Sequence, residues 1–223
     1  MNRTVKNVIH PFIVIIVLVA ATPTFAQVKF GLKGGLNLTN MLAKDNNQNL
    51  GKDFYIKPGF HLGATAAFSM SKKFGLESGL LFSTKGYMTE FWSIKRTIQV
   101  NYLELPILAV YKIDLGRTNL LIHAGPYIGY ALSGKLKANQ PILGPNNDAK
   151  EEALKIGNDK LKDDIKPLDW GLNIGSAAEV NHITVGMQYG TGIANISAYT
   201  DNKTVIKNRV FYISLGYRFG KSY

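Results

Sequence analysis

The chain of 223 residues contains no cysteine, and only 18% of its residues carry a charge. The absence of cysteine excludes a disulfide-stabilised scaffold, and it also excludes a lipid anchor attached to an N-terminal cysteine. With 46% hydrophobic residues, the chain is too apolar to be a disordered tail. Its length fits one folded domain, or at most two small ones.

The sequence also has no hydrophobic run long enough to cross a membrane as a helix. The apolar run over 12–21 is about half as long as the roughly 20 residues that a spanning helix needs. It follows Arg3 and Lys6 and precedes the small-residue pattern Thr24-Phe25-Ala26. This order is typical of a secretory signal peptide that is cleaved after Ala26.

We therefore divide the chain into a signal peptide, residues 1–26, and a mature domain, residues 27–223. An uncleaved membrane anchor is the alternative for the first segment, but the apolar run is too short for it. Loss of Arg3 and Lys6 takes the formal net charge from +11 to +9. The mature domain therefore stays strongly basic.

Alternating apolar and polar residues in the mature domain predict β-strands rather than helices. Glycine recurs inside the alternating segments, where each one would cost a packed helix about 1 kcal/mol. A strongly curved small barrel tolerates glycine at such positions. The expected strands are 28–38, 56–70, 74–90, 98–113, 118–134, 168–180, 183–196 and 208–220.

The links between these segments alternate between short turns and long polar stretches. Short turns on one rim and long loops on the other are typical of outer-membrane barrels, whose short turns face the periplasm. In the longest link the stretch 148–155 is compatible with a short helix, although we expect a mobile, solvated loop over 135–167. The short links are 71–73, 114–117 and a reversal near Asn181, and the long ones are 39–55, 91–97, 135–167 and 197–207.

The two faces of the expected strands differ in character. One face is apolar, and the other mixes glycine with charges of both signs. If the apolar face points outward it contacts lipid, and if it points inward it lines the pocket of a soluble, lipocalin-like barrel. Eight strands enclose an interior just wide enough for side chains to fill, so we expect a mutually neutralising charge network in the lumen and no open pore. The expected luminal charges are Lys29, Lys33, Glu77, Lys85, Glu104, Asp169, Glu179 and Arg218.

Aromatic residues near the expected strand ends favour the lipid-facing arrangement, because aromatic girdles mark both membrane interfaces. Together with the signal peptide, they predict an all-β fold: an eight-stranded antiparallel up-and-down transmembrane β-barrel, monomeric, in the outer membrane. The expected girdle residues are Tyr87, Phe91, Trp92, Tyr102, Tyr111, Tyr127, Tyr130, Tyr189, Tyr212 and Tyr217.

Catalytic and metal-binding patterns are weak. His61, His123 and His182 lie on separate segments without the spacing of metal ligands. A serine hydrolase site would pair His123 with Ser133 or Ser83, and no motif supports that pairing. The carboxylates of the luminal set are better explained as partners of luminal Lys and Arg, since an unpaired buried charge is costly. We expect no catalytic residues, no metal, no cofactor and no enzymatic activity.

Five segments of the mature chain form a family pattern. They are Phe30-Gly-Leu-Lys-Gly-Gly-Leu-Asn-Leu, Gly75-Leu-Glu-Ser-Gly-Leu-Leu-Phe-Ser-Thr-Lys-Gly-Tyr, Tyr102-Leu-Glu-Leu-Pro-Ile-Leu, Gly125-Pro-Tyr-Ile-Gly-Tyr and Phe211-Tyr-Ile-Ser-Leu-Gly-Tyr-Arg-Phe. In these segments the chain resembles the outer-membrane β-barrel family that includes PorT-like proteins of Gram-negative bacteria. The resemblance covers essentially the whole mature chain, and the run from Tyr102 is its most specific element.

The resemblance implies an eight-stranded outer-membrane barrel and little about activity. The PorT branch of the family is associated with a protein secretion and gliding system. Barrels of this kind often end on an aromatic residue that serves the barrel-assembly machinery. Here Phe219 is followed by Gly220-Lys221-Ser222-Tyr223, so either Phe219 or Tyr223 would take that role.

The basic charge indicates an anionic partner. Basic groups at an anionic membrane surface gain on the order of 1 kcal/mol each, so we expect attraction to lipopolysaccharide phosphates at the outer rim. The signal peptide and the dispersed lysines argue against nucleic acid. We expect a structural or interaction platform with loops 39–55 and 135–167 outside, with secretion-system or surface partners. The alternatives are a narrow porin or small-solute channel, an outer-membrane lipid-modifying enzyme and a soluble lipocalin-like binder.

Overall fold

The computed structural model describes residues 27–45, 48–49, 54–91, 94–139, 150–199 and 203–219. The expected signal peptide, Trp92 and Tyr223 lie outside these residues. None of the described residues forms a helix long and apolar enough to cross a membrane. The long strands are β1 (Gln27–Asp45), β4 (Lys57–Ser69), β5 (Phe74–Phe91), β6 (Ile94–Asp114), β7 (Asn119–Asn139), β9 (Leu168–Val180), β10 (Ile183–Gly192) and β11 (Val205–Arg218), and the short ones are β2 (Gln48–Asn49), β3 (Phe54–Tyr55) and β8 (Lys150–Ala153).

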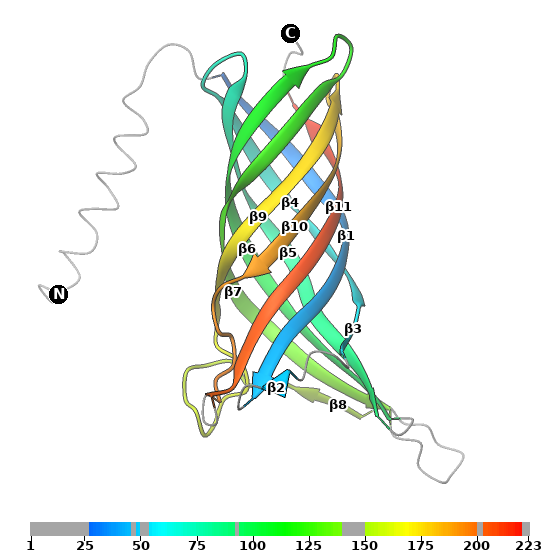
Figure 1. The fold of residues 1–223 in the computed structure, drawn as a ribbon, viewed down its shortest axis with the longest axis vertical. Helices are drawn as coiled ribbons and strands as arrows, with labels where there is room; N and C mark the ends of the chain where they lie inside the picture. Colours follow the sequence, from blue (N-terminus) through cyan, green and yellow to red (C-terminus); the bar gives the residue numbers. More distant parts are fainter. Residues whose placement is uncertain are drawn as a thin grey trace, which may run out of the picture.

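The long strands form one antiparallel sheet that closes on itself. Their order is β11-β10-β9-β7-β6-β5-β4-β1, so each long strand lies beside the next one along the chain. The first strand also pairs with the last, from Gly31↔Arg218 to Lys44↔Val205. The result is a cylinder of tilted strands with both chain ends of the barrel at the same rim (Figure 1). The predicted eight-stranded, antiparallel, up-and-down fold is therefore confirmed.

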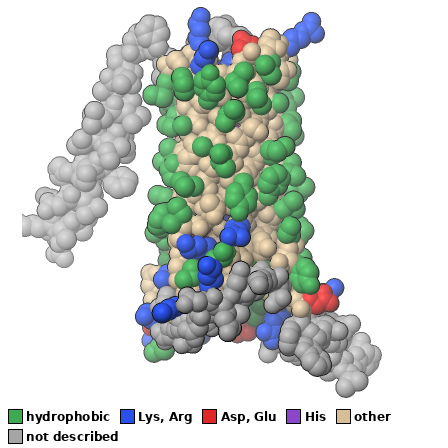
Figure 2. All heavy atoms as spheres, in the orientation of Figure 1, with side chains coloured by type: hydrophobic (Ala, Val, Ile, Leu, Met, Phe, Trp, Pro, Cys, Tyr) green, Lys and Arg blue, Asp and Glu red, His purple; other side chains and the backbone are tan. Residues whose placement is uncertain are grey.

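The outer wall is apolar. In β9 the exposed residues Leu168, Trp170 and Leu172 alternate with the buried residues Asp169 and Asn173. Hydrophobic side chains cover the wall between the two ends (Figure 2). A continuous exposed apolar surface of this kind is suited to contact with lipid rather than water. The apolar faces therefore do not line a cavity, as the lipocalin-like alternative requires.

The two rims differ in the length of their connections. At the short-turn end, β4–β5, β6–β7 and β9–β10 are joined by brief reversals, and Gly116 and Asn181 supply the positive φ values of 84° and 54° that two of them use. The strands also approach each other closely inside the wall. A Cβ added at Gly63 would lie 2.0 Å from the carbonyl oxygen of Leu80, so only glycine fits there.

The link 135–167 differs from the loop expected over that range. Strand β7 continues to Asn139, and Lys150–Ala153 pairs with it as strand β8 instead of forming a short helix. Cross-strand ion pairs explain the pairing, since Glu151 lies 3.2 Å from Lys135 Nζ and 2.9 Å from Lys137 Nζ. Hydrogen bonds from Lys137 and Lys135 also lower the pKa of Glu151.

The predicted aromatic girdle is wrong for four tyrosines. Tyr87 packs against the apolar core at the long-loop end, where it stacks on Phe54. The other three are Tyr102, Tyr127 and Tyr212. Their side chains point into the lumen and are 0%, 3% and 4% exposed. Each shares the inward face of its strand with charged residues, and each hydroxyl takes part in a luminal hydrogen bond. Successive side chains of a strand point to opposite faces, so the face on which an aromatic residue falls, rather than its distance from the strand end, decides whether it points to lipid or to the lumen. The expected girdle residues that are exposed on the wall are Tyr111, Tyr130, Tyr189 and Tyr217.

Candidate functional site

A buried ion cluster occupies the lumen toward the long-loop end. Lys85 of β5 lies between Glu104 of β6 and Asp169 of β9, and the three side chains are 1%, 5% and 0% exposed. The Lys85 ammonium donates a hydrogen bond of 3.0 Å to Asp169 Oδ2 and forms an ion pair with Glu104. Inward-facing positions on three strands thus bring together residues as far as 84 positions apart in the sequence.

Neutral polar side chains complete this cluster. The ring centroids of Tyr102 and Tyr127 lie 5.1 Å and 4.3 Å from Lys85 Nζ, which adds cation–π attraction to the ion pairs. Tyr127 donates its hydroxyl hydrogen to Asp169 Oδ2 at 3.2 Å, and Asn208 Nδ2 donates to the same oxygen at 2.9 Å. We call Lys85, Glu104, Asp169, Tyr102, Tyr127 and Asn208 the Lys85 cluster.

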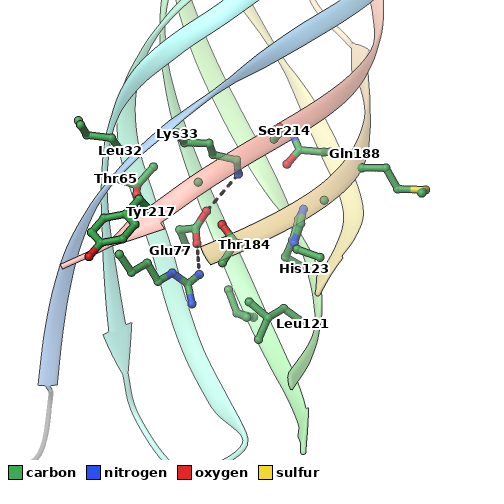
Figure 3. Close-up of a pocket in the computed structure, with 16 residues that line it drawn as sticks. Leu32, Lys33, Thr65, Glu77, Leu121, His123, Thr184, Gln188, Ser214 and Tyr217 are labelled. Atoms are coloured by element: carbon green, nitrogen blue, oxygen red, sulfur yellow. Dashed lines mark hydrogen bonds and ion pairs between the residues drawn. The ribbon is translucent and has the colours of Figure 1, made fainter. Parts of the chain in front are cut away.

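A second ion cluster lies toward the short-turn end. Glu77 accepts a hydrogen bond of 2.6 Å from Arg218 and one of 3.2 Å from Lys33. Arg218 also pairs with Glu179. Figure 3 shows the Lys33 side chain reaching toward Glu77 across the lumen. We call Lys33, Glu77, Glu179 and Arg218 the Arg218 cluster.

The two clusters contain seven of the eight charges expected in the lumen. The eighth, Lys29, stands apart at the short-turn end and makes no ion pair with the described residues. The neutral members Tyr102, Tyr127 and Asn208 were not expected there. Their inward position could have been predicted from the alternation of faces along a strand. Tyr102, for example, precedes Glu104 by two residues and so shares its face of β6.

Between the clusters lies a serine–histidine–amide chain. Ser214 Oγ is 3.0 Å from His61 Nε2, and His61 Nδ1 is 2.7 Å from Asn37 Oδ1. This order resembles the arrangement that activates a serine nucleophile. The adjoining void of about 20 Å³ has room for one water and none for a substrate. Asn37 also donates hydrogen bonds to Ser83 Oγ and to backbone carbonyls, so the chain is part of the lumen packing.

The serine pairings considered for His123 do not form. Ser133 lies ten positions further along β7, roughly 33 Å away along the strand, and hydrogen-bonds to Asn101. Ser83 accepts its hydrogen bond from Asn37. His123 instead lines a second luminal void of about 30 Å³ together with Gln188 (Figure 3). Among the described residues no three His, Asp or Glu side chains gather closely enough to ligate a metal ion.

An apolar core closes the long-loop end of the lumen. The segments that follow β8 and β10 fold back over the mouth, where Lys166 N donates to Ile196 O at 2.8 Å and Ile165 bridges to Ser197. Ile196 is fully buried. Beneath this core the Lys85 cluster fills the cross-section. The core residues are Met41, Val100, Tyr102, Ala131, Ile165, Ala194 and Ile196, with Phe54, Tyr87, Ile98, Leu154, Ile156 and Ile206 packed against them.

A closed antiparallel barrel with an apolar wall and a charged, filled interior defines an integral outer-membrane β-barrel protein. Residues 25–198 match the family described as outer membrane protein beta-barrel domain, and the chain belongs to this family. The match is to the family as a whole and does not single out its PorT-like branch. No curated protein matches the chain.

Two solved outer-membrane proteins match the chain at low sequence identity and with TM-scores below 0.5. Ail, the attachment invasion locus protein of Yersinia pestis, solved in complex with the heparin analogue sucrose octasulfate, is 15% identical with a TM-score of 0.41. That match covers 86% of this chain and 99% of Ail. Neisserial surface protein A is 10% identical with a TM-score of 0.42, again over 86% of this chain and 99% of the other.

The Lys85 cluster predicts the effect of removing its cation. Replacing Lys85 with Met leaves two buried carboxylates without their countercharge, so we expect the free energy of unfolding to fall by about 3–5 kcal/mol. Urea unfolding in lipid vesicles, followed by tryptophan fluorescence, measures this change. A further change of Glu104 to Gln and Asp169 to Asn in the same chain is expected to restore much of the loss, because no charge is then left unpaired.

The matched control is Lys95→Met. Lys95 pairs with Glu90 at 3.7 Å, and both side chains are exposed, so its loss is expected to cost at most about 1 kcal/mol. Equal destabilisation by Lys85→Met and Lys95→Met would contradict a structural role for the buried cluster.

Proposed function

We propose that this protein is a non-conducting, non-enzymatic barrel of the Gram-negative outer membrane that holds its long-loop end as a platform at the cell surface. The observation that carries the proposal is the apolar core across the long-loop mouth, which anchors the loops and closes the lumen with the same residues. In barrels of this family the short turns face the periplasm, so the anchored loops face outward.

The filled lumen supports this proposal over a narrow channel. Solute passage needs a continuous aqueous path, whereas the voids beside His123 and His61, of about 30 Å³ and 20 Å³, have room for only one or two waters each. The same lack of space argues against an enzyme that works inside the barrel. The serine–histidine–amide chain has no cavity in which an ester could approach Ser214.

The segment after β8 presents an apolar residue on a well-defined turn. Asp159 Oδ1 accepts a hydrogen bond of 2.9 Å from Leu161 N, and Asp163 Oδ2 accepts one of 2.8 Å from Asp159 N. These bonds hold Leu161, whose side chain is 90% exposed, at the surface of the turn. An apolar side chain held in this way has no role in the barrel core and suits contact with a partner protein.

A photoreactive amino acid placed at position 161 tests the platform proposal. We expect it to cross-link to a protein partner in intact cells, because the position faces outward on an anchored turn. The matched position is Ile174, which is 61% exposed on the wall of β9 and faces lipid. Cross-linking to protein from neither position, or equally from both, would contradict the platform.

The outer wall also offers a site for lipopolysaccharide. Lys207 and Arg209 lie two residues apart on the same face of β11, and Lys44 lies beside them on β1, where Leu42 pairs with Lys207. None of the three basic groups makes an ion pair with the described residues. Along β11 the next residue on this face is the exposed Phe211, so the basic group begins where the apolar band ends.

Figure 2 shows basic side chains on this part of the wall, next to the last hydrophobic ones. That level corresponds to the phosphates of outer-leaflet lipopolysaccharide, whose attraction to each basic group is worth on the order of 1 kcal/mol. We propose lipopolysaccharide as the lipid partner of this basic group.

Changing Lys44, Lys207 and Arg209 together to Gln tests the lipid partner. We expect lipopolysaccharide retained by the detergent-extracted barrel to fall about tenfold or more, because three phosphate contacts are lost. The control changes Lys155, Lys160 and Lys162 to Gln, which removes the same charge from the loop turn. An equal fall in both variants would show net charge rather than a wall site.

The remaining proposals concern the processing and assembly of the chain and its place within the barrel family. We propose that residues 1–26 are removed as a signal peptide, that the mature barrel is a monomer, and that the barrel-assembly machinery recognises Phe219 or Tyr223. A PorT-like role with secretion-system partners rests on the sequence motifs, of which the run from Tyr102 to Leu108 is the most specific.

A further inference from the structure

The short-turn end of the barrel contains a cavity of about 660 Å³ that opens toward the periplasm. The Arg218 cluster forms its floor, through Arg218 and Glu179. Lys29 of β1 and Lys112 of β6 line it from the barrel strands, and Lys72 and Lys73 line it from the β4–β5 turn. A cavity of this size is typical of small-molecule sites.

The cations of this cavity lack countercharges. Arg218 is neutralised by Glu77 and Glu179, the pairs already described. Lys29, Lys72, Lys73 and Lys112 make neither an ion pair nor a side-chain hydrogen bond through their ammonium groups with the described residues. Lys33 and Lys85, further inside the lumen, each have a carboxylate partner, whereas the buried Lys57 near the long-loop end donates only to the backbone carbonyl of Pro58. The cavity therefore concentrates four positive charges that no described carboxylate neutralises.

We propose that this cavity binds a phosphate-bearing ligand, either the headgroup of an anionic phospholipid from the surrounding leaflet or a soluble phosphate compound. Ammonium groups on flexible stems bind phosphate as point charges from several directions. Four of them around one cavity suit a compact anion with more than one acceptor oxygen, such as a phosphate ester.

The cavity wall favours the phospholipid as the source. Beside the lysines, the lining includes Phe68, Met70 and Phe74 near the β4–β5 turn. Met70 and Phe74 are also exposed on the outside, so their apolar surface continues from the cavity onto the wall. A lipid with its headgroup over the rim and its acyl chains along β4 and β5 would contact both surfaces. A soluble phosphate compound would use only the lysines.

Calorimetric titration of the barrel in dodecyl maltoside, a detergent without phosphate, tests the site. The probes are inorganic tripolyphosphate, short-chain phosphatidylglycerol, and a diacylglycerol of the same chain length that lacks phosphate. We expect Lys29→Gln/Lys112→Gln to weaken binding of the phosphate probes about tenfold or more, because two of the four ammonium groups that line the cavity are lost. Neither lysine is part of an ion pair, so the variant is expected to fold, which a comparison of unheated and boiled samples by gel migration checks.

The control variant is Lys155→Gln/Lys160→Gln, which removes the same charge at the opposite end. Binding of phosphatidylglycerol but not tripolyphosphate would support the site with a lipid source, and binding of tripolyphosphate would support it with a soluble one. The proposal is overturned if neither phosphate probe binds, if diacylglycerol binds as well as phosphatidylglycerol, or if both variants weaken binding equally.

Discussion

The Lys85 ammonium, enclosed by Glu104, Asp169 and two tyrosine rings, is the constraint around which the lumen is organised. The wall of this barrel faces lipid, so polar side chains in the middle of the strands point inward and find their partners in the lumen. A single buried cation would be very costly there, and an isolated carboxylate equally so. Because the cation and the carboxylates neutralise each other, a narrow barrel can carry charges in its centre. The same ion pairs determine which face of β5, β6 and β9 points into the lumen.

The two ends of the lumen have opposite characters, and the proposed functions follow from that difference. At the long-loop end the chain folds back over the mouth and seals it with an apolar core, so the loops become an anchored surface. At the short-turn end the lumen opens into a cavity with four unpaired lysines. A platform that faces outward and a phosphate site that faces the periplasm can therefore coexist on one closed barrel.

Much of this fold is predictable from the alternation of residues, because the two faces of each strand meet such different surroundings. Asp169 between Leu168 and Trp170 is an inward charge on any lipid-facing barrel, and the register then brings it to Lys85. Contacts that depend on distant strands are not predictable in this way. Ser214 and His61 are 153 positions apart, and only closure of the sheet joins them. The pairing of Lys150–Ala153 with β7 escaped prediction for a related reason, since the helix-compatible composition of 148–155 gave no sign of its cross-strand partners.

Conductance across a planar lipid bilayer tests the closed lumen most directly. The purified barrel, inserted beside a known porin that confirms the sensitivity of the membrane, is expected to give no stepwise current of its own, because the Lys85 cluster and the apolar core fill the cross-section. Discrete, reproducible current steps from the barrel alone would contradict the account and make a narrow channel the better description.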